Sequence, residues 1–172
     1  MSGLRLVIDI QEQTRFWKTS PSNLYEEEVL EPILDILRPM IDRAGTMLLS
    51  EYDPLDYAEL APVLCWIDSE HNPDRYRFRL IGTRIIESYG IDNTGIYLDT
   101  LKDELGESYE EVRTAFEWTA KQKCLLRQSN TFEWVNRKHI RLESLQFPLL
   151  GNDGKTKSIV SYTVFANPQI ED

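Results

Sequence analysis

The chain has 172 residues, of which 41% are apolar and 28% are charged, with 8 Gly and 8 Pro. This length and balance predict one globular domain and exclude collagen-like, disordered and low-complexity chains. The net charge of −10 would repel a phosphate backbone, so we expect no nucleic-acid partner.

The N-terminal part is expected to form an arm followed by a helix. Residues 1–22 show no clear periodicity, and a helix over 23–44 is predicted from apolar residues at helical spacing, with Asn23 and Glu26 as a cap pair. Pro32 and Pro39 predict a kink or two shorter helices instead of one straight helix. Its apolar stripe must be covered by the sheet or by a second chain, which favours a homodimer. The stripe consists of Ile33, Ile36, Leu37, Met40 and Ile41.

Two strands are expected next, over 63–68 and 75–81, joined by turn residues at 71–74. The second strand alternates almost perfectly between arginines and apolar residues. We therefore predict that one face is exposed and carries Arg75, Arg77 and Arg79. The other face, with Tyr76, Phe78 and Leu80, should pack against helices.

Short helical segments follow, and three strands close the chain. Thr83 is a candidate cap for a helix ending at Gly90, and Ser108 with Glu111 resembles a capping box for a helix to about residue 123. The last strands are expected at 125–135, 139–150 and 157–166, with a hairpin turn at 151–154. This order predicts an α+β fold: a five-stranded antiparallel sheet, short helices inserted between strands 2 and 3, and an N-terminal helical extension.

This order and several short motifs resemble the PAS domain family, in particular short stand-alone bacterial PAS-type proteins. The resemblance covers about residues 51–165 and is most specific from 76 to 95. It implies a sensory or regulatory domain over 51–172, with residues 1–50 as an N-terminal arm and helix. The motifs are residues 77–83, Ile86, Tyr89-Gly90, Thr94-Gly95, Asp53-Pro54-Leu55-Asp56, Glu143, Leu145 and Pro148-Leu149.

Catalytic and metal-binding patterns are weak in this sequence. His71 and His139 have no nearby nucleophile or acid at a spacing typical of catalysis, and the acidic residues lack the register of a calcium loop. We therefore expect no enzymatic activity, no catalytic residue and no metal site. The family resemblance disfavours haem, because the helix from Ser108 has no histidine, and a flavin–cysteine adduct, because residues 83–105 have no cysteine.

A pocket for an unidentified small molecule is predicted in the interior, where aromatic side chains can line a cavity and Tyr89 or Tyr162 can orient a ligand. The same residues could equally form a filled core. The pocket candidates are Trp66, Phe78, Ile86, Tyr89, Phe116, Phe147 and Tyr162.

The cellular setting follows from the absence of two signals. No apolar run reaches the roughly 20 residues of a membrane-spanning helix, and no secretion signal is evident. Cys65 and Cys124 are expected to be buried free thiols of a cytoplasmic protein. We thus expect a non-catalytic PAS-like module for signal transduction, acting through a ligand or a signalling protein partner and without a membrane partner. The alternatives are a small enzyme or ligand-binding protein on an α+β cone fold, and a ligand-free interaction scaffold.

Overall fold

The computed structural model describes residues 5–8, 15–18, 46–134 and 137–166, and the structural statements below concern these residues. The helix expected over 23–44 lies outside the described residues. The same holds for its candidate interface residues Ile33, Ile36, Leu37, Met40 and Ile41.

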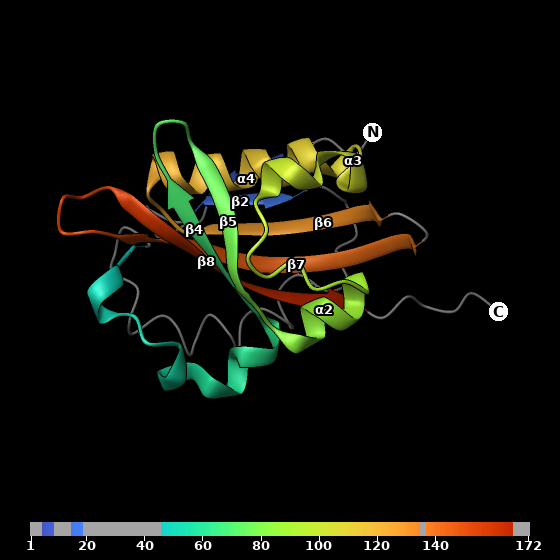
Figure 1. Ribbon diagram of the computed structural model, residues 1–172, viewed down its shortest axis with the longest axis horizontal. Coiled ribbons are helices and arrows are strands. Elements are labelled where there is room, and N and C mark those ends of the chain that lie inside the picture. The colour runs from blue at the N-terminus through green and yellow to red at the C-terminus, as the bar shows by residue number, and fades with distance from the viewer. Residues whose placement is uncertain (1–4, 9–14, 19–45, 135–136, 167–172) are drawn as a thin grey trace.

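Five long strands form the centre of the structure (Figure 1). In the sheet they follow the order β6-β7-β8-β4-β5, and every pair of neighbours is antiparallel. This arrangement, with the helices inserted between β5 and β6, confirms the predicted α+β fold. The strands are β4 (Leu64–Glu70), β5 (Arg75–Ile81), β6 (Leu126–Trp134), β7 (Arg137–Leu150) and β8 (Thr156–Ala166).

Three short strands extend this sheet and were not predicted. β1 (Arg5–Ile8) and β2 (Arg15–Lys18) form an antiparallel pair, and β2 runs parallel to β6 at the edge of the sheet. β3 (Met47–Leu48) pairs in parallel with the end of β7. With four or fewer residues each, these strands are too short for alternation to show in the sequence.

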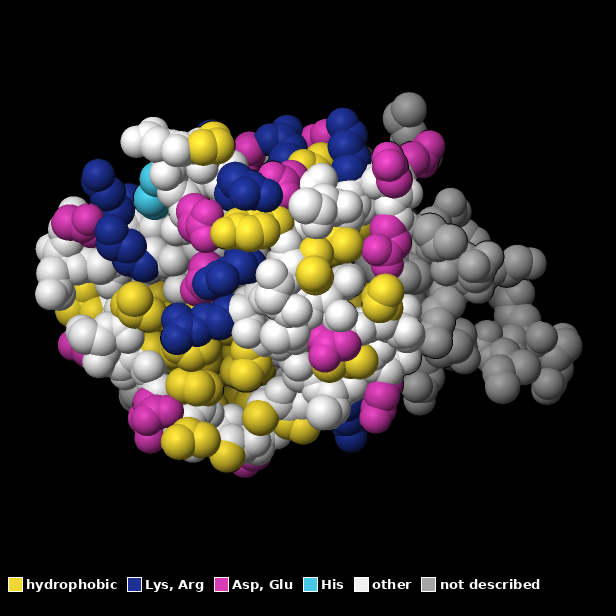
Figure 2. All heavy atoms as spheres, in the orientation of Figure 1, with side chains coloured by type: hydrophobic (Ala, Val, Ile, Leu, Met, Phe, Trp, Pro, Cys, Tyr) yellow, Lys and Arg dark blue, Asp and Glu magenta, His cyan; other side chains and the backbone are white. Residues whose placement is uncertain are grey.

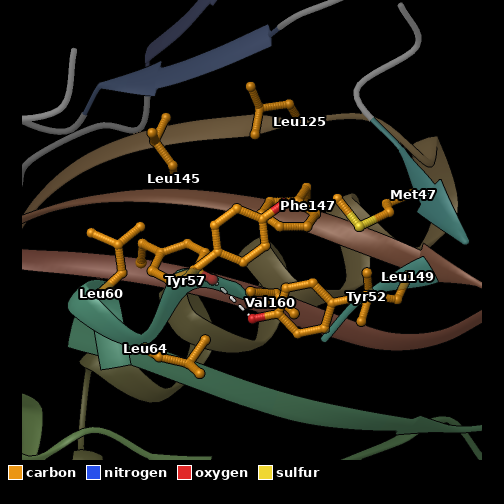
Figure 3. Close-up of a cluster of buried hydrophobic side chains, with 11 residues drawn as sticks. Met47, Tyr52, Tyr57, Leu60, Leu64, Leu125, Leu145, Phe147, Leu149 and Val160 are labelled. Atoms are coloured by element: carbon orange, nitrogen blue, oxygen red, sulfur yellow. Dashed lines mark hydrogen bonds between the residues drawn. The ribbon is translucent and has the colours of Figure 1, made fainter. Parts of the chain in front are cut away.

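Helices cover both faces of the sheet, which therefore has a core on each side. The inner face packs against the segments inserted between β5 and β6: α2 (Thr83–Tyr89), η3 (Leu98–Leu101), α3 (Lys102–Leu105) and α4 (Ser108–Gln122). The outer face packs against η1 (Leu49–Glu51) and η2 (Pro54–Val63), the 3-10 helices that precede β4. Figure 3 shows this outer core, which contains Tyr52, Tyr57 and Phe147.

A β-bulge interrupts the alternation of β5. Trp66 pairs with Leu80 and Ile67 pairs with Phe78, so Arg79 is an extra residue between two pairs. An extra residue shifts the alternation by one position. The prediction that Leu80 faces the helices is therefore wrong: it shares the outer face with Trp66, and 43% of its surface is exposed.

The arginine row of β5 lies on the accessible side, as predicted. Arg75 donates two hydrogen bonds to Asp99, at 2.7 and 2.9 Å, and Arg77 donates one to Asp68 at 2.8 Å. The guanidinium of Arg79 stacks 4.5 Å from the ring centre of Trp66. Figure 2 shows Lys and Arg side chains beside acidic ones on this face. Ion pairs this exposed contribute little stability, so the row is a solvated surface.

Two predicted helix caps are absent. The N-cap of α2 is Gly82, so Thr83 is already the first helical residue and its side chain caps nothing. The N-cap of α4 is Glu107, which has helical backbone angles, and no side chain caps this helix either. Because α4 begins directly from the preceding turn, Ser108 lies inside the helix and is buried.

Gly82 is required by a close approach rather than by an unusual backbone angle. A Cβ atom at this position would lie 2.4 Å from the carbonyl oxygens of Ala61 and Pro62. The amide of Gly82 also donates a 2.7 Å hydrogen bond to the carbonyl of Leu64. The end of β5 is thus held against the end of η2, and a side chain at residue 82 would separate them.

Candidate functional site: a cavity between the sheet and the helices

A cavity of about 100 Å³ lies between the inner face of the sheet and the helices of the insertion. Ile91 lines it with 42% of its surface exposed, so the cavity reaches the surface beside the end of α2. The wall is mostly apolar because α2, η3, α3 and α4 each direct their buried side toward the sheet. The apolar residues that line it, besides Ile91, are Cys65, Ile67, Phe78, Ile81, Ile85, Tyr89, Leu101, Leu105, Val112, Ala115 and Phe116.

The floor of the cavity is polar. Ser144 and Gln146 of β7 lie opposite Thr163 and Ser161 of β8, and all four line the cavity. The hydroxyl oxygens of Ser161 and Thr163 are 3.3 Å apart and share one hydrogen bond. Two adjacent strands thus place two cross-strand polar pairs under an apolar roof.

The side chain of Gln146 connects this floor to α4. Its amide nitrogen Nε2 donates one hydrogen bond to the carbonyl oxygen of Ala115, at 3.0 Å, and another to Oγ1 of Thr119, at 2.7 Å. Only 2% of the residue is exposed. A second contact anchors the same helix, since Oγ1 of Thr156 donates to the carbonyl of Ala120 at 2.8 Å. Hydrogen bonds from the sheet therefore fix the position of α4 at its C-terminal half.

The cavity lining contains no charged side chain among the described residues. The wall also carries the Tyr89 hydroxyl and the Cys65 thiol, and the remaining polar side chains of the lining are Asn93 and Ser108. An ion placed here would lose its hydration without a compensating charge, at a cost of several kcal/mol or more. The site is therefore suited to an uncharged molecule.

The titratable groups of the wall stay protonated at neutral pH. Burial raises the pKa of the Cys65 thiol to about 12, and burial also raises the pKa of the Tyr89 hydroxyl. A thiol in that state is a poor nucleophile, because the thiolate is the reactive form. Cys65 therefore contributes shape and apolar surface to the wall.

The structure separates the predicted pocket residues into two groups. Phe78, Tyr89 and Phe116 line the cavity. Trp66, Phe147 and Tyr162 belong to the outer core on the opposite face of the sheet, so the prediction that they line the same pocket is wrong. The physical reason is strand alternation, which places them on the outer face of β4, β7 and β8. Ile86 is half-buried on α2 and does not line the cavity either.

The polar floor was missed by the sequence reasoning. Residues 144–147 read Ser-Leu-Gln-Phe, which looks like a strand with one wet and one buried face. In the structure both faces are covered, and the polar face is the one beneath α4. One signal could have revealed the floor. The helices predicted between β5 and β6 need a sheet face to cover, and Ser144 and Gln146 lie on the face opposite Leu145 and Phe147.

No cluster of three metal-ligating side chains is present within the described residues. His71 lies in the β4–β5 turn, where Nδ1 is 3.2 Å from Asp74 and Nε2 is 2.8 Å from the carbonyl oxygen of Thr156. These contacts join two hairpin turns and leave the histidine remote from the cavity. Among the helices of the described residues, none is long and apolar enough to cross a membrane.

Comparison with known proteins finds no matching family model and no similar curated sequence. Solved structures with a related backbone include a light-oxygen-voltage protein of Rhodobacter sphaeroides, with 12% identity, a TM-score of 0.49, and 69% of this chain and 70% of that chain covered. The PAS domain of Bordetella pertussis BvgS gives 12% identity and a TM-score of 0.49 over 69% of this chain and 90% of that chain.

An RNA-binding light-oxygen-voltage receptor gives 15% identity and a TM-score of 0.46, and the match covers 85% of this chain but only 35% of that one. Such distant likeness concerns the arrangement of the backbone and carries no ligand or partner over to this chain. The absence of a nucleic-acid partner stays a prediction from the acidic charge.

Proposed function

We propose that this chain is a PAS-like sensory module that binds a small, uncharged molecule in the cavity and has no catalytic role. The observation that carries the proposal is the polar floor formed by Ser144, Gln146, Ser161 and Thr163 within an apolar enclosure. The fold provides the scaffold, and the composition of this cavity supports the function.

A filled scaffold core would be expected to avoid such a floor. Buried polar groups cost free energy unless they are hydrogen-bonded, so cores use apolar side chains or complete networks. The hydroxyl of Ser144 makes no side-chain hydrogen bond within the described residues, although the residue is buried. A polar ligand, or a water that a ligand displaces, would complete this network.

The size of the cavity bears on the cofactor. A cavity of about 150 Å³ holds a single six-membered ring, and this one measures about 100 Å³. The fused rings of a flavin or haem therefore do not fit without widening. No histidine lies in α4, and Cys65 lies on a strand with a raised pKa, so both groups stay disfavoured.

Signal transmission would run through α4. The helix roofs the cavity and is hydrogen-bonded to the floor through Gln146, so a bound molecule can favour one position of the helix over another. Its effect is limited by its difference in affinity for the two positions. The proposal also includes two earlier predictions: a boundary at residue 50 between the N-terminal arm and the PAS-like domain, and a homodimer formed through residues 23–44.

The experiment is a ligand screen on wild type and two matched variants. Native mass spectrometry would look for a co-purified small molecule, and neutral fragments would be screened by thermal unfolding. Ser161→Ala removes a hydroxyl from the cavity floor. Ser158→Ala removes one from the outer face of the same strand, where the hydroxyl has no hydrogen-bond partner among the described residues.

A fragment that binds in the cavity through Ser161 should bind Ser161→Ala about tenfold more weakly, the equivalent of one hydrogen bond. Its affinity for Ser158→Ala should stay unchanged. If nothing co-purifies and no fragment stabilises the wild type, the ligand-free scaffold is the better interpretation.

A further inference from the structure

We infer that Gln146 makes the cavity selective for molecules that donate a hydrogen bond. This inference rests on the proposed ligand-binding function and adds the chemical class of the ligand. Two contacts between Gln146 and α4 carry it, because they determine which end of the side-chain amide is left for a ligand.

The orientation of this amide is fixed by its partners. The backbone carbonyl of Ala115 can only accept a hydrogen bond, so the atom 3.0 Å from it must be the nitrogen Nε2. The second hydrogen of the same nitrogen is used by Oγ1 of Thr119 at 2.7 Å. Both donor hydrogens of Gln146 are thus committed to α4.

The carbonyl oxygen Oε1 is the part of the side chain that remains. Within the described residues it accepts no hydrogen bond, and Gln146 lines the cavity while only 2% of it is exposed. An amide rotation that presented Nε2 to the cavity would break two hydrogen bonds and bring Oε1 against the carbonyl of Ala115. The hydrogen-bond acceptor Oε1 of Gln146 is therefore held in a fixed position at the cavity.

The other polar groups of the lining do not discriminate in this way. The hydroxyls of Ser108, Ser144, Ser161 and Thr163 rotate, and each can donate or accept. The amide of Asn93 makes no side-chain hydrogen bond within the described part of the chain, so it can turn either end to a ligand. Gln146 differs from these groups because both donor hydrogens of its amide are bound to α4, which fixes its polarity.

A ligand of the matching class is a small neutral molecule with an N–H or O–H group and an apolar body. Its donor satisfies Oε1, and its apolar part contacts Phe78, Phe116 and the aliphatic wall. A molecule of the same shape without a donor leaves this buried acceptor unpaired, which weakens its binding.

Pyrrole and furan provide the test, because they are neutral rings of the same size and only pyrrole carries an N–H donor. Their dissociation constants would be measured by ligand-observed NMR titration against the intact protein. We expect pyrrole to bind the wild type about tenfold more tightly than furan, the equivalent of one net hydrogen bond.

Two variants locate the source of this preference. Gln146→Met keeps the length of the side chain but removes the acceptor, so the two rings should bind with nearly equal affinity. Ser158→Ala, which removes a hydroxyl from the outer face of β8 and not from the cavity, should retain the preference. If Gln146→Met does not fold, the wild-type Cδ resonance of Gln146 serves instead: it should shift with pyrrole and stay in place with furan.

The outcomes separate the two proposals. Equal binding of both rings to the wild type, or a preference that persists in Gln146→Met, would overturn the selectivity and leave ligand binding intact. An unchanged Cδ resonance on pyrrole binding would do the same. If neither ring binds, the small-molecule function itself fails, and the selectivity fails with it.

Discussion

The hydroxyl groups of Tyr52 and Tyr162 lie 2.8 Å apart in a buried hydrogen bond that joins the segment before η2 to the last strand (Figure 3). The contact spans 110 positions of the sequence, so it links the two ends of the described core domain. Tyr57 stacks on Tyr52 with ring centres 6.2 Å apart, yet its own hydroxyl has no partner among the described residues. These three tyrosines differ in what their hydroxyls contribute.

Tyr52→Phe should lower the free energy of unfolding by about 1–3 kcal/mol, because the hydroxyl of Tyr162 then stays buried without a partner. The double variant Tyr52→Phe/Tyr162→Phe should lose less than the sum of the single variants. Urea denaturation measures all three. Tyr57→Phe is the matched control and should change stability by less than about 0.5 kcal/mol; a larger loss would reveal a partner such as a bound water.

Gly82→Ala should destabilise the fold by about 1–3 kcal/mol or more, since the new Cβ would overlap the carbonyls of Ala61 and Pro62. The neighbouring control Thr83→Ala should stay within about 0.5 kcal/mol of wild type, because Thr83 is exposed and caps nothing. Thermal unfolding would compare them. Equal losses for the two variants would contradict the close approach at Gly82.

Phe116→Ala and Phe147→Ala should each cost about 3–5 kcal/mol, as expected for truncating a buried aromatic ring. Phe116 packs on Tyr76 and Phe78 while lining the cavity, whereas Phe147 lies on the other face of the sheet. Only Phe116→Ala should therefore alter ligand affinity and admit larger molecules. A parallel ligand change in Phe147→Ala would show that the two cores are not independent.

The protein should lose stability at alkaline pH. Burial raises the pKa of Cys65 from 9.0 to about 12 and the pKa of Tyr162 from 10.0 to about 12. Below about pH 9 the folded and the unfolded protein both hold these protons, so the free energy of unfolding does not depend on their titration. Between that pH and about 12 the unfolded chain binds fewer protons, so the free energy of unfolding falls as pH rises. Urea midpoints across this range test it, and a constant midpoint would contradict it.

The five long strands were predictable from the sequence because their alternation and turn residues are local signals. The antiparallel hairpin at 151–154 and the strand at 75–81 are confirmed at nearly the expected residues. The assignment of faces was not predictable from one strand at a time. Trp66 and Phe147 obey alternation fully, but alternation does not say which face of the sheet encloses a cavity.

The residues of the candidate site were harder to find for a related reason. Ser144 and Gln146 have the composition of a solvent-exposed strand face, and only the path of α4 across the sheet buries them. The predicted side-chain caps at Thr83 and Ser108 are absent because each helix begins one residue earlier than expected, with Gly82 and Glu107 at the N-cap positions. Such features depend on contacts between distant segments.

The extra residue in β5 reverses the alternation of side chains along the strand. Up to Phe78 the odd residues point outward, and after Arg79 the order is reversed, which turns Ile81 into the cavity and Leu80 away from it. A regular strand with the same residues and no bulge would exchange these two side chains. The wall of the cavity at this point is thus specified by the bulge as well as by the amino acids. A correct alignment with an unbulged relative needs a gap at position 79.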